Sequence, residues 1–101
     1  MVRLLVAYET PSDPEAFDRH YRQVHVPLAK ALPGLRRYTL SRNATSLRGE
    51  PFYLVAELDW DDMDALRAAM ASPAGEAAAD DVANALPHSG MRSSFFELEE
   101  V

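Results

Sequence analysis

Hydrophobic and polar residues alternate along four short stretches of the chain, at residues 2–9, 35–42, 52–60 and 91–99. Alternation with a period of two is typical of a β-strand with one buried face. The third stretch shows it most clearly, because one of its faces carries Phe52, Leu54, Ala56, Leu58 and Trp60. We therefore expect four strands.

The segment after the first strand has the spacing of a helix. Asp13 is a good N-cap, and Pro14 suits the first helical position. Apolar residues then recur at helical spacing and form one stripe, made of Phe17, Tyr21, Val24, Leu28 and Leu32. Pro27 interrupts this stripe, so we expect a kink or a helix end near His25.

Two further helical segments follow the third strand. The first begins near Asp61, and the second begins at Ser72 and Pro73, again a cap followed by a first-turn proline. The buried line of the second is expected to consist of Ala74, Ala78, Val82 and Ala85. The order βαββαβ predicts a single α+β domain over residues 1–101, a ferredoxin-like sandwich with a four-stranded antiparallel sheet.

Helices on one side of such a sheet leave its other side uncovered. That side is expected to carry Leu5, Val55 and one of Phe95 or Phe96, which would form a large exposed apolar patch. Packing two such faces together about a two-fold axis would bury both copies. The pattern therefore predicts a homodimer that associates through its sheet faces.

Charge and composition limit the classes of partner that the protein is expected to bind. The formal net charge of −6 argues against binding to nucleic acid, and the cluster Arg36, Arg37, Arg42 and Arg48 is interpreted as a solvated strand edge and loop. No apolar run approaches the roughly 18–20 residues that span a bilayer, and no export signal is evident. We expect a cytoplasmic protein with no membrane partner. The absence of cysteine excludes thiol catalysis, disulfides and cysteine zinc sites.

His25 is the strongest candidate for chemistry, because histidine exchanges protons near neutral pH. It lies beside the apolar stripe, where Pro27 would open room for a small molecule between helix and sheet. If Tyr38 lies under the helix, its phenol could approach His25 in a mostly apolar cleft. The alternatives are a half-solvated histidine and a core tyrosine with a satisfied hydroxyl.

The remaining histidines, carboxylates and glycines are weaker candidates than this pair. His20 is expected at the surface, about 140° from His25 on a regular helix, which disfavours a shared metal site. The carboxylates are interpreted as helix caps and solvated charge. No glycine-rich phosphate loop or nucleotide fingerprint is present, so no cofactor is expected. Candidate cleft-lining residues are Tyr21, Leu28, Trp60 and His88.

Two motifs remain. One runs Phe17-x-x-His20-Tyr21-x-x-x-His25-x-Pro27-Leu28 and continues through Leu32-Pro33-Gly34-Leu35 to Tyr38, and the other is Ala71-Ser72-Pro73-Ala74-Gly75-Glu76 before Asp80-Asp81-Val82. Both resemble the EthD family, named for ethyl tert-butyl ether degradation. The resemblance implies a dimeric α+β barrel in which His25 and Tyr38 match cleft positions. Relatives in that superfamily include lactone isomerases, polyketide cyclases, cofactor-free monooxygenases and haem-binding enzymes.

These observations favour a protein that binds a small apolar or aromatic molecule. It would act as a cofactor-independent isomerase, cyclase or oxygenase on an enolisable or aromatic compound in a degradation or secondary-metabolite pathway. His25 would be the acid or base and Tyr38 the partner of the reacting oxygen. The alternatives are a non-catalytic accessory or binding protein and, less favoured, a haem binder with a histidine as axial ligand.

Overall fold

The structure, a computed structural model, describes residues 1–86 and 90–101. Its strands are β1 (Val2–Tyr8), β2 (Arg37–Leu40), β3 (Leu54–Trp60) and β4 (Arg92–Glu97). Its helices are α1 (Pro14–His20), the π-helix η1 (Tyr21–His25), α2 (Val26–Lys30), α3 (Met63–Ala71) and α4 (Pro73–Ala85). The strands form one antiparallel sheet in the order β2-β3-β1-β4. The predicted α+β class and βαββαβ order are confirmed.

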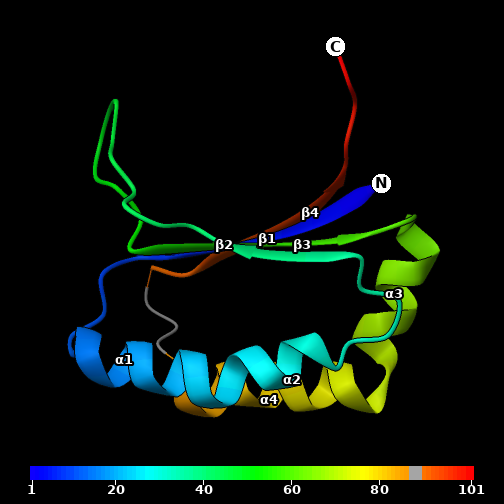
Figure 1. The fold of residues 1–101 in the computed structure, drawn as a ribbon, viewed down its shortest axis with the longest axis horizontal. Coiled ribbons are helices and arrows are strands. Elements are labelled where there is room, and N and C mark those ends of the chain that lie inside the picture. The colour runs from blue at the N-terminus through cyan, green and yellow to red at the C-terminus, as the bar shows by residue number, and fades with distance from the viewer. Residues whose placement is uncertain (87–89) are drawn as a thin grey trace.

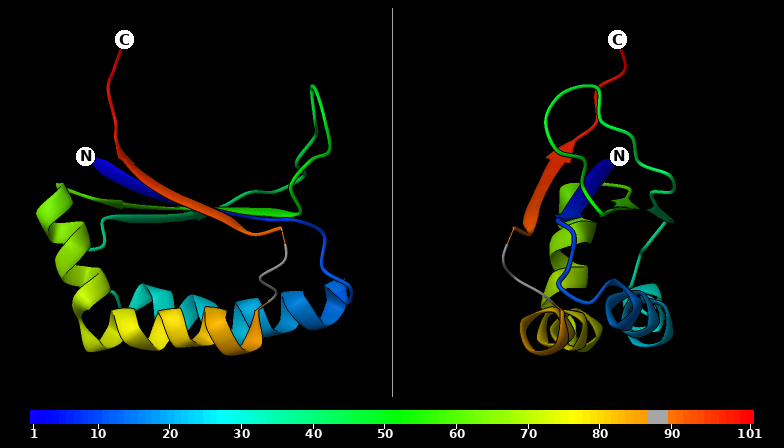
Figure 2. Two further views of the ribbon diagram at one scale, coloured as in Figure 1. Left: turned by 180° about the vertical axis from the view of Figure 1, so that it is seen from behind. Right: turned by 90° about the vertical axis from the view of Figure 1, so that its left-hand side faces the viewer.

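The molecule has a sheet layer and a helical layer. Helices α1, η1 and α2 follow one another end to end along one side of the sheet, α4 runs beside them, and α3 descends at one end to join the two layers (Figures 1 and 2). The connection between β2 and β3 and the C-terminal tail rise on the other side of the sheet, from opposite ends (Figure 1). None of the helices in the described residues has the length and apolar character needed to cross a bilayer.

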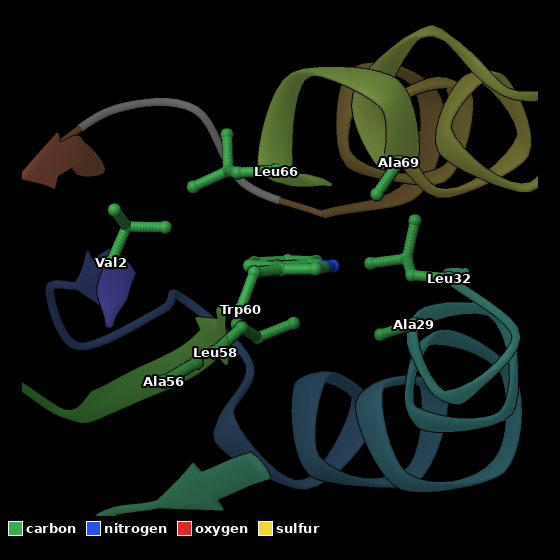
Figure 3. Packing of buried hydrophobic residues seen from close by; sticks show 8 residues of the cluster. All are labelled: Val2, Ala29, Leu32, Ala56, Leu58, Trp60, Leu66 and Ala69. Carbon is green, nitrogen blue, oxygen red and sulfur yellow. The ribbon is translucent and has the colours of Figure 1, made fainter. Parts of the chain in front are cut away.

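Trp60 anchors the core between the two layers. Its side chain is 0% exposed, and its indole N–H donates a hydrogen bond of 2.9 Å to the carbonyl of Pro33. Gly34 follows with φ of +73° and passes over the indole ring, since an added Cβ would lie 3.4 Å from the Cδ1 atom of Trp60. Figure 3 shows the surrounding cluster of Val2, Ala29, Leu32, Ala56, Leu58, Trp60, Leu66 and Ala69.

The first helical region differs from the expected stripe. Its buried residues are Phe17, Tyr21, His25, Ala29 and Leu32. Val24, which was expected in the stripe, is instead 41% exposed. Residues four apart drift by about 40° per step on a regular α-helix. The wider π turn cancels part of this drift, so His25 moves from the margin of the stripe into its centre.

Pro27 accounts for the position of the wide turn. It lies in the first turn of α2, directly after η1, and it has no N–H to donate to the carbonyl of Gln23. The N–H of Val26 bonds instead to the carbonyl of Tyr21, five residues back, as in a π-helix. The proline thus produces a widened turn within a continuous helical segment.

The uncovered side of the sheet, here called the open face, is less apolar than expected. Strand pairing places Leu5, Val55 and Phe96 on this face, and it places Arg3 beside Asp59 among them. The arginine donates two hydrogen bonds to Asp59, of 2.8 and 3.0 Å, and it also pairs with Glu57 at 2.8 Å. The face therefore combines apolar residues with a charged network, because alternate positions of β1 and β3 carry these ionic side chains.

Candidate functional site

A cavity of about 280 Å³ lies between the helices and the sheet. It is lined by Leu4, Val6, Tyr8, Tyr21, His25, Ala29, Leu32, Tyr38, Ala56, Leu58, Met70, Gly75, Ala78, Ala79, Val82, Met91 and Ser93. Most of these side chains are aliphatic or aromatic, and the few polar ones come from η1, β1, β2 and β4. A concave, mostly apolar space with a few polar groups is typical of a small-molecule site.

One carboxylate joins two histidines at the wall of this cavity. The Oδ2 atom of Asp81 lies 2.9 Å from the Nδ1 atom of His25, and its Oδ1 atom lies 2.8 Å from the Nε2 atom of His20. The side chains of Asp81 and His25 are each 9% exposed, whereas that of His20 is 30% exposed. The cluster therefore extends from the cavity wall toward solvent.

The π-helix explains why the two histidines meet. Residues five apart are about 140° apart on an α-helix, which led to the expectation that His20 and His25 diverge. A π-helix closes its turns with bonds between residues five apart, so the same two residues come close to one face. The expected separation is wrong for this reason. Asp81, about two and a half turns along α4 from Ser72, then reaches both rings.

A pair of phenols lies beside the histidine. The hydroxyls of Tyr21 and Tyr38 are hydrogen bonded at 2.8 Å, and the ring of Tyr21 lies with its centroid 5.0 Å from that of His25. Burial raises the pKa of Tyr21, and the neighbouring Tyr38 adds to the effect. Burial also raises the pKa of Tyr38. Both phenols are thus protonated at neutral pH and are able to donate hydrogen bonds.

The geometry gives His25 a defined chemical role. A carboxylate that accepts the Nδ1–H proton fixes the neutral imidazole in the tautomer whose Nε2 atom carries the lone pair. Within the described residues, Nε2 of His25 has no hydrogen-bond partner, and His25 lines the cavity. The arrangement can therefore accept a proton at Nε2, and the carboxylate would stabilise the resulting imidazolium.

Comparison with known proteins identifies the family. A sequence model of the EthD domain matches residues 9–86, more than half of the chain. The chain belongs to the EthD family. An uncharacterized 11.0 kDa protein of Rhodococcus erythropolis, from the thcB–thcC intergenic region, is 41% identical to this EthD chain over 103 residues. The match covers 100% of this chain and 98% of that protein.

Solved structures share the fold. An EthD family protein from Bacillus halodurans is 35% identical, with a TM-score of 0.89 over 98% of this chain and 99% of that one. SnoaB, a cofactor-independent oxygenase from Streptomyces nogalater, is 24% identical, with a TM-score of 0.67 and coverage of 99% and 94%. A dimeric ferredoxin-like protein from Thermobifida fusca is 19% identical, with a TM-score of 0.70 and coverage of 96% and 90%. The last two likenesses concern the fold alone.

Of the other residues predicted for the site, some line the cavity and others do not. Tyr21 and Tyr38 both line the cavity, and Tyr38 bonds to Tyr21 rather than to His25. Leu28 is half-buried and Trp60 is fully buried in the core, and neither belongs to the cavity lining. His88, the remaining candidate, lies outside the described residues.

Asp81 is the site residue that the sequence analysis did not single out. It was named only within the second EthD-like motif, with no role assigned, although it lies three residues after Ala78 and four before Ala85. Helical spacing alone therefore places it on the small-residue stripe of α4. An acidic residue on an otherwise apolar stripe was the available signal, since a carboxylate with little exposure needs a partner.

His20, Asp81 and His25 are arranged to hydrogen bond with one another. The structure finds no group of three or more His, Asp or Glu side chains suited to hold a metal ion in the part of the chain that it describes. In the same residues, every fully buried side-chain nitrogen and oxygen has a hydrogen-bond partner. The site therefore offers a ligand one imidazole nitrogen, the phenol pair, the hydroxyls of Tyr8 and Ser93, and an apolar surround.

Proposed function

We propose that this EthD-family protein binds a small apolar or aromatic molecule in the cavity and catalyses proton transfer on it without a cofactor. The substrate would be an enolisable carbonyl compound or a phenol. The reaction would be an isomerisation, a cyclisation or an oxygenation with dioxygen as co-substrate, and each would begin with loss of a proton. The observation that carries the proposal is the Asp81–His25 pair, held at 2.9 Å in the wall of a mostly apolar cavity.

The first chemical step is removal of a proton by Nε2 of His25. The C–H or O–H bond of the substrate breaks, the proton moves to the imidazole, and the electron pair stays on the substrate as an enolate or phenolate. Asp81 stabilises the imidazolium through Nδ1, as a buried carboxylate does in other acid–base sites. Return of the proton to a different carbon would complete an isomerisation.

The tyrosine pair would hold the oxygen that becomes negative. Two phenols that bond to each other use one hydroxyl hydrogen between them, so the second hydrogen stays available. Because Tyr21 and Tyr38 line the cavity, that hydrogen can be donated to a ligand oxygen. In a mostly apolar space such a donor stabilises a developing oxyanion more strongly than water-exposed groups do. SnoaB shares the fold and is a cofactor-independent oxygenase, so this fold is compatible with chemistry that needs no cofactor.

A hydrogen-exchange experiment tests the proposal. A panel of cyclic diketones, lactones and polyphenols is incubated with the protein in D₂O, and exchange at the acidic carbon is followed by NMR. We expect wild type to accelerate exchange for at least one compound and His25→Asn to lose about 10²–10⁴-fold of that rate. Gln23→Ala, an exposed change in the same π turn, is the matched control and should keep the wild-type rate. Equal rates for wild type and His25→Asn would refute the mechanism.

A second candidate is a binding protein without catalysis. The mostly apolar lining of the cavity favours it. This candidate predicts a higher melting temperature with a ligand from the same panel but no exchange above background. The remaining alternative, a haem-binding protein, is tested by adding haem. Axial ligation by His25 would shift the Soret band, and His25→Asn would abolish that shift.

We also propose that two copies associate through their open faces. Leu5, Val55 and the 39% exposed Phe96 supply apolar area there. The β2–β3 connection and the C-terminal tail flank the same face at its two ends (Figure 1). The dimeric ferredoxin-like protein from Thermobifida fusca supports this association.

A further inference from the structure

A second cavity of about 280 Å³ lies outside the first, where the helical segment passes the edge strand β2. It is lined by Arg22, Val26, Lys30, Tyr38, Leu40 and Arg42. Half of these residues are cations, and none of the described residues that line it is acidic. This is unusual in a chain whose formal net charge is −6, because the surrounding protein carries the opposite charge.

Two independent periodicities bring these residues together. Arg22, Val26 and Lys30 follow one another at intervals of four along η1 and α2, so they lie along one side of the helical segment. Tyr38, Leu40 and Arg42 follow at intervals of two along and just beyond β2, so they point to one side of the strand. The cations thus surround a floor made of Val26, Leu40 and the ring of Tyr38.

The three cations are available to a ligand. Arg22, Lys30 and Arg42 are exposed, and within the described residues none of them forms an ion pair with a carboxylate. By contrast Arg36, from the same predicted arginine cluster, is paired with Asp61 at 2.8 Å. Two guanidinium groups offer planar, bidentate donors that match the geometry of a carboxylate.

We propose that this second cavity binds the carboxylate of an organic acid whose apolar portion rests on Val26, Leu40 and Tyr38. The aliphatic floor favours an aryl or alkyl carboxylate over a fully hydrated inorganic anion. The site goes beyond the proton chemistry at His25, since it requires neither that residue nor Asp81. The carboxylate would belong either to the molecule that fills the first cavity or to a separate acid.

Tyr38 connects the two cavities, because it lines both of them. Burial raises the pKa of Tyr38, while its hydrogen bond to Tyr21 and the positive charge of Arg22 act in the opposite direction. Arg22 also opposes the rise in the pKa of Tyr21. The guanidinium of Arg22 is therefore close enough to influence the phenol pair. An anion bound to Arg22 would offset this positive charge and so alter the pKa of the two phenols in the first cavity.

NMR titration of the labelled full chain tests the site directly. The probes are benzoate, 4-phenylbutyrate, inorganic phosphate and the neutral benzamide. We expect saturable shifts of the Val26 and Leu40 resonances with both carboxylates, weaker binding of phosphate, and none of benzamide. Arg22→Gln and Arg42→Gln should each weaken benzoate binding about tenfold or more, and added salt should weaken it further.

Matched controls keep the result interpretable. Arg67→Gln removes an equally exposed arginine from α3, away from both cavities, and should leave benzoate binding unchanged. Benzoate binding is measured apart from hydrogen exchange, so failure of the proton chemistry and failure of this site are separable. Shifts at Val26 and Leu40 alone indicate a separate acid, whereas joint saturation at Ala78 indicates one ligand that spans both cavities. Equal effects of all arginine variants, or benzamide binding as tightly as benzoate, would overturn the proposal.

Discussion

The two faces of the single sheet differ more than their shared strands suggest. Along β3, Leu54, Ala56, Leu58 and Trp60 point toward the helices and are all buried. The intervening residues Val55, Glu57 and Asp59 point to the open face, and two of them are acidic. One strand therefore supplies an apolar wall for a cavity on one side and a charged surface on the other.

The difference shows how each face uses its polar groups. On the helix side, polar side chains are few, and most of them belong to the His20–Asp81–His25 cluster or to the tyrosine pair. On the open side, Asp59 is nearly as buried as the core but is compensated by Arg3. Enclosed apolar space suits a ligand, whereas a mixed surface with paired charges suits association with another protein surface.

Removal of Trp60 should have the largest effect on stability. Trp60→Ala deletes a fully buried ring and its hydrogen bond to Pro33, and we expect a loss of about 3–5 kcal/mol in the free energy of unfolding. Urea denaturation measures this loss in the free energy of unfolding. Thr39→Ala, on the open face of β2, should cost much less. Similar losses for the two variants would mean that the open face contributes as much to the fold as the core.

Arg3 should be the next most sensitive position. Arg3→Met leaves the carboxylate of Asp59 buried without its partner, at a cost of about 3 kcal/mol near pH 7. The hydrogen bond from Arg3 lowers the pKa of Asp59, and its positive charge adds to this. A lowered folded-state pKa stabilises the protein above the ordinary carboxyl pKa, and this contribution is lost as the pH falls through the lowered value.

The pH dependence supplies the control for that variant. Urea denaturation of wild type and Arg3→Met is compared at about pH 7 and about pH 3. We expect the difference in unfolding free energy to shrink at the lower pH, because protonation of Asp59 removes the unpaired charge. A difference that does not change with pH would show that Arg3 acts through its aliphatic packing instead.

Adjacent phenylalanines in β4 test which face mediates association. Pairing of β4 with β1 places Phe96 beside Arg3 on the open face and Phe95 beside Leu4 on the helix side. We expect Phe96→Ala to weaken self-association by about tenfold, as removal of a buried aromatic contact does, and Phe95→Ala to change it little. Sedimentation at micromolar concentration measures both. A wild-type protein that stays monomeric there would contradict the proposed dimer.

The smallest expected effect concerns the tyrosine pair. Tyr21→Phe removes one hydrogen bond from the cavity wall and should lower the free energy of unfolding by about 1 kcal/mol. Tyr53→Phe removes a phenol that bonds to Asp18 at the exposed surface and should cost less. If Tyr21→Phe instead stabilised the protein, the hydroxyl would be retained for ligand binding at the expense of stability.

Periodicity in the sequence was sufficient to predict the fold. Alternation in 52–60 correctly separated the buried face of β3 from its open face, since side chains of a strand alternate strictly. The cap and proline at Ser72 and Pro73 correctly marked the start of α4. The resemblance to the EthD family was also visible in the sequence and is confirmed by the family match.

The site depended on tertiary structure. The π turn before Pro27 moved His25 into the buried stripe and turned His20 toward it, which no count on a regular helix reproduces. Asp81 reaches both rings from a helix about 60 residues away, and such a distant contact has no local signature in the chain. Local periods determined which residues face inward, whereas only the packing of helices on the sheet decided which polar groups meet.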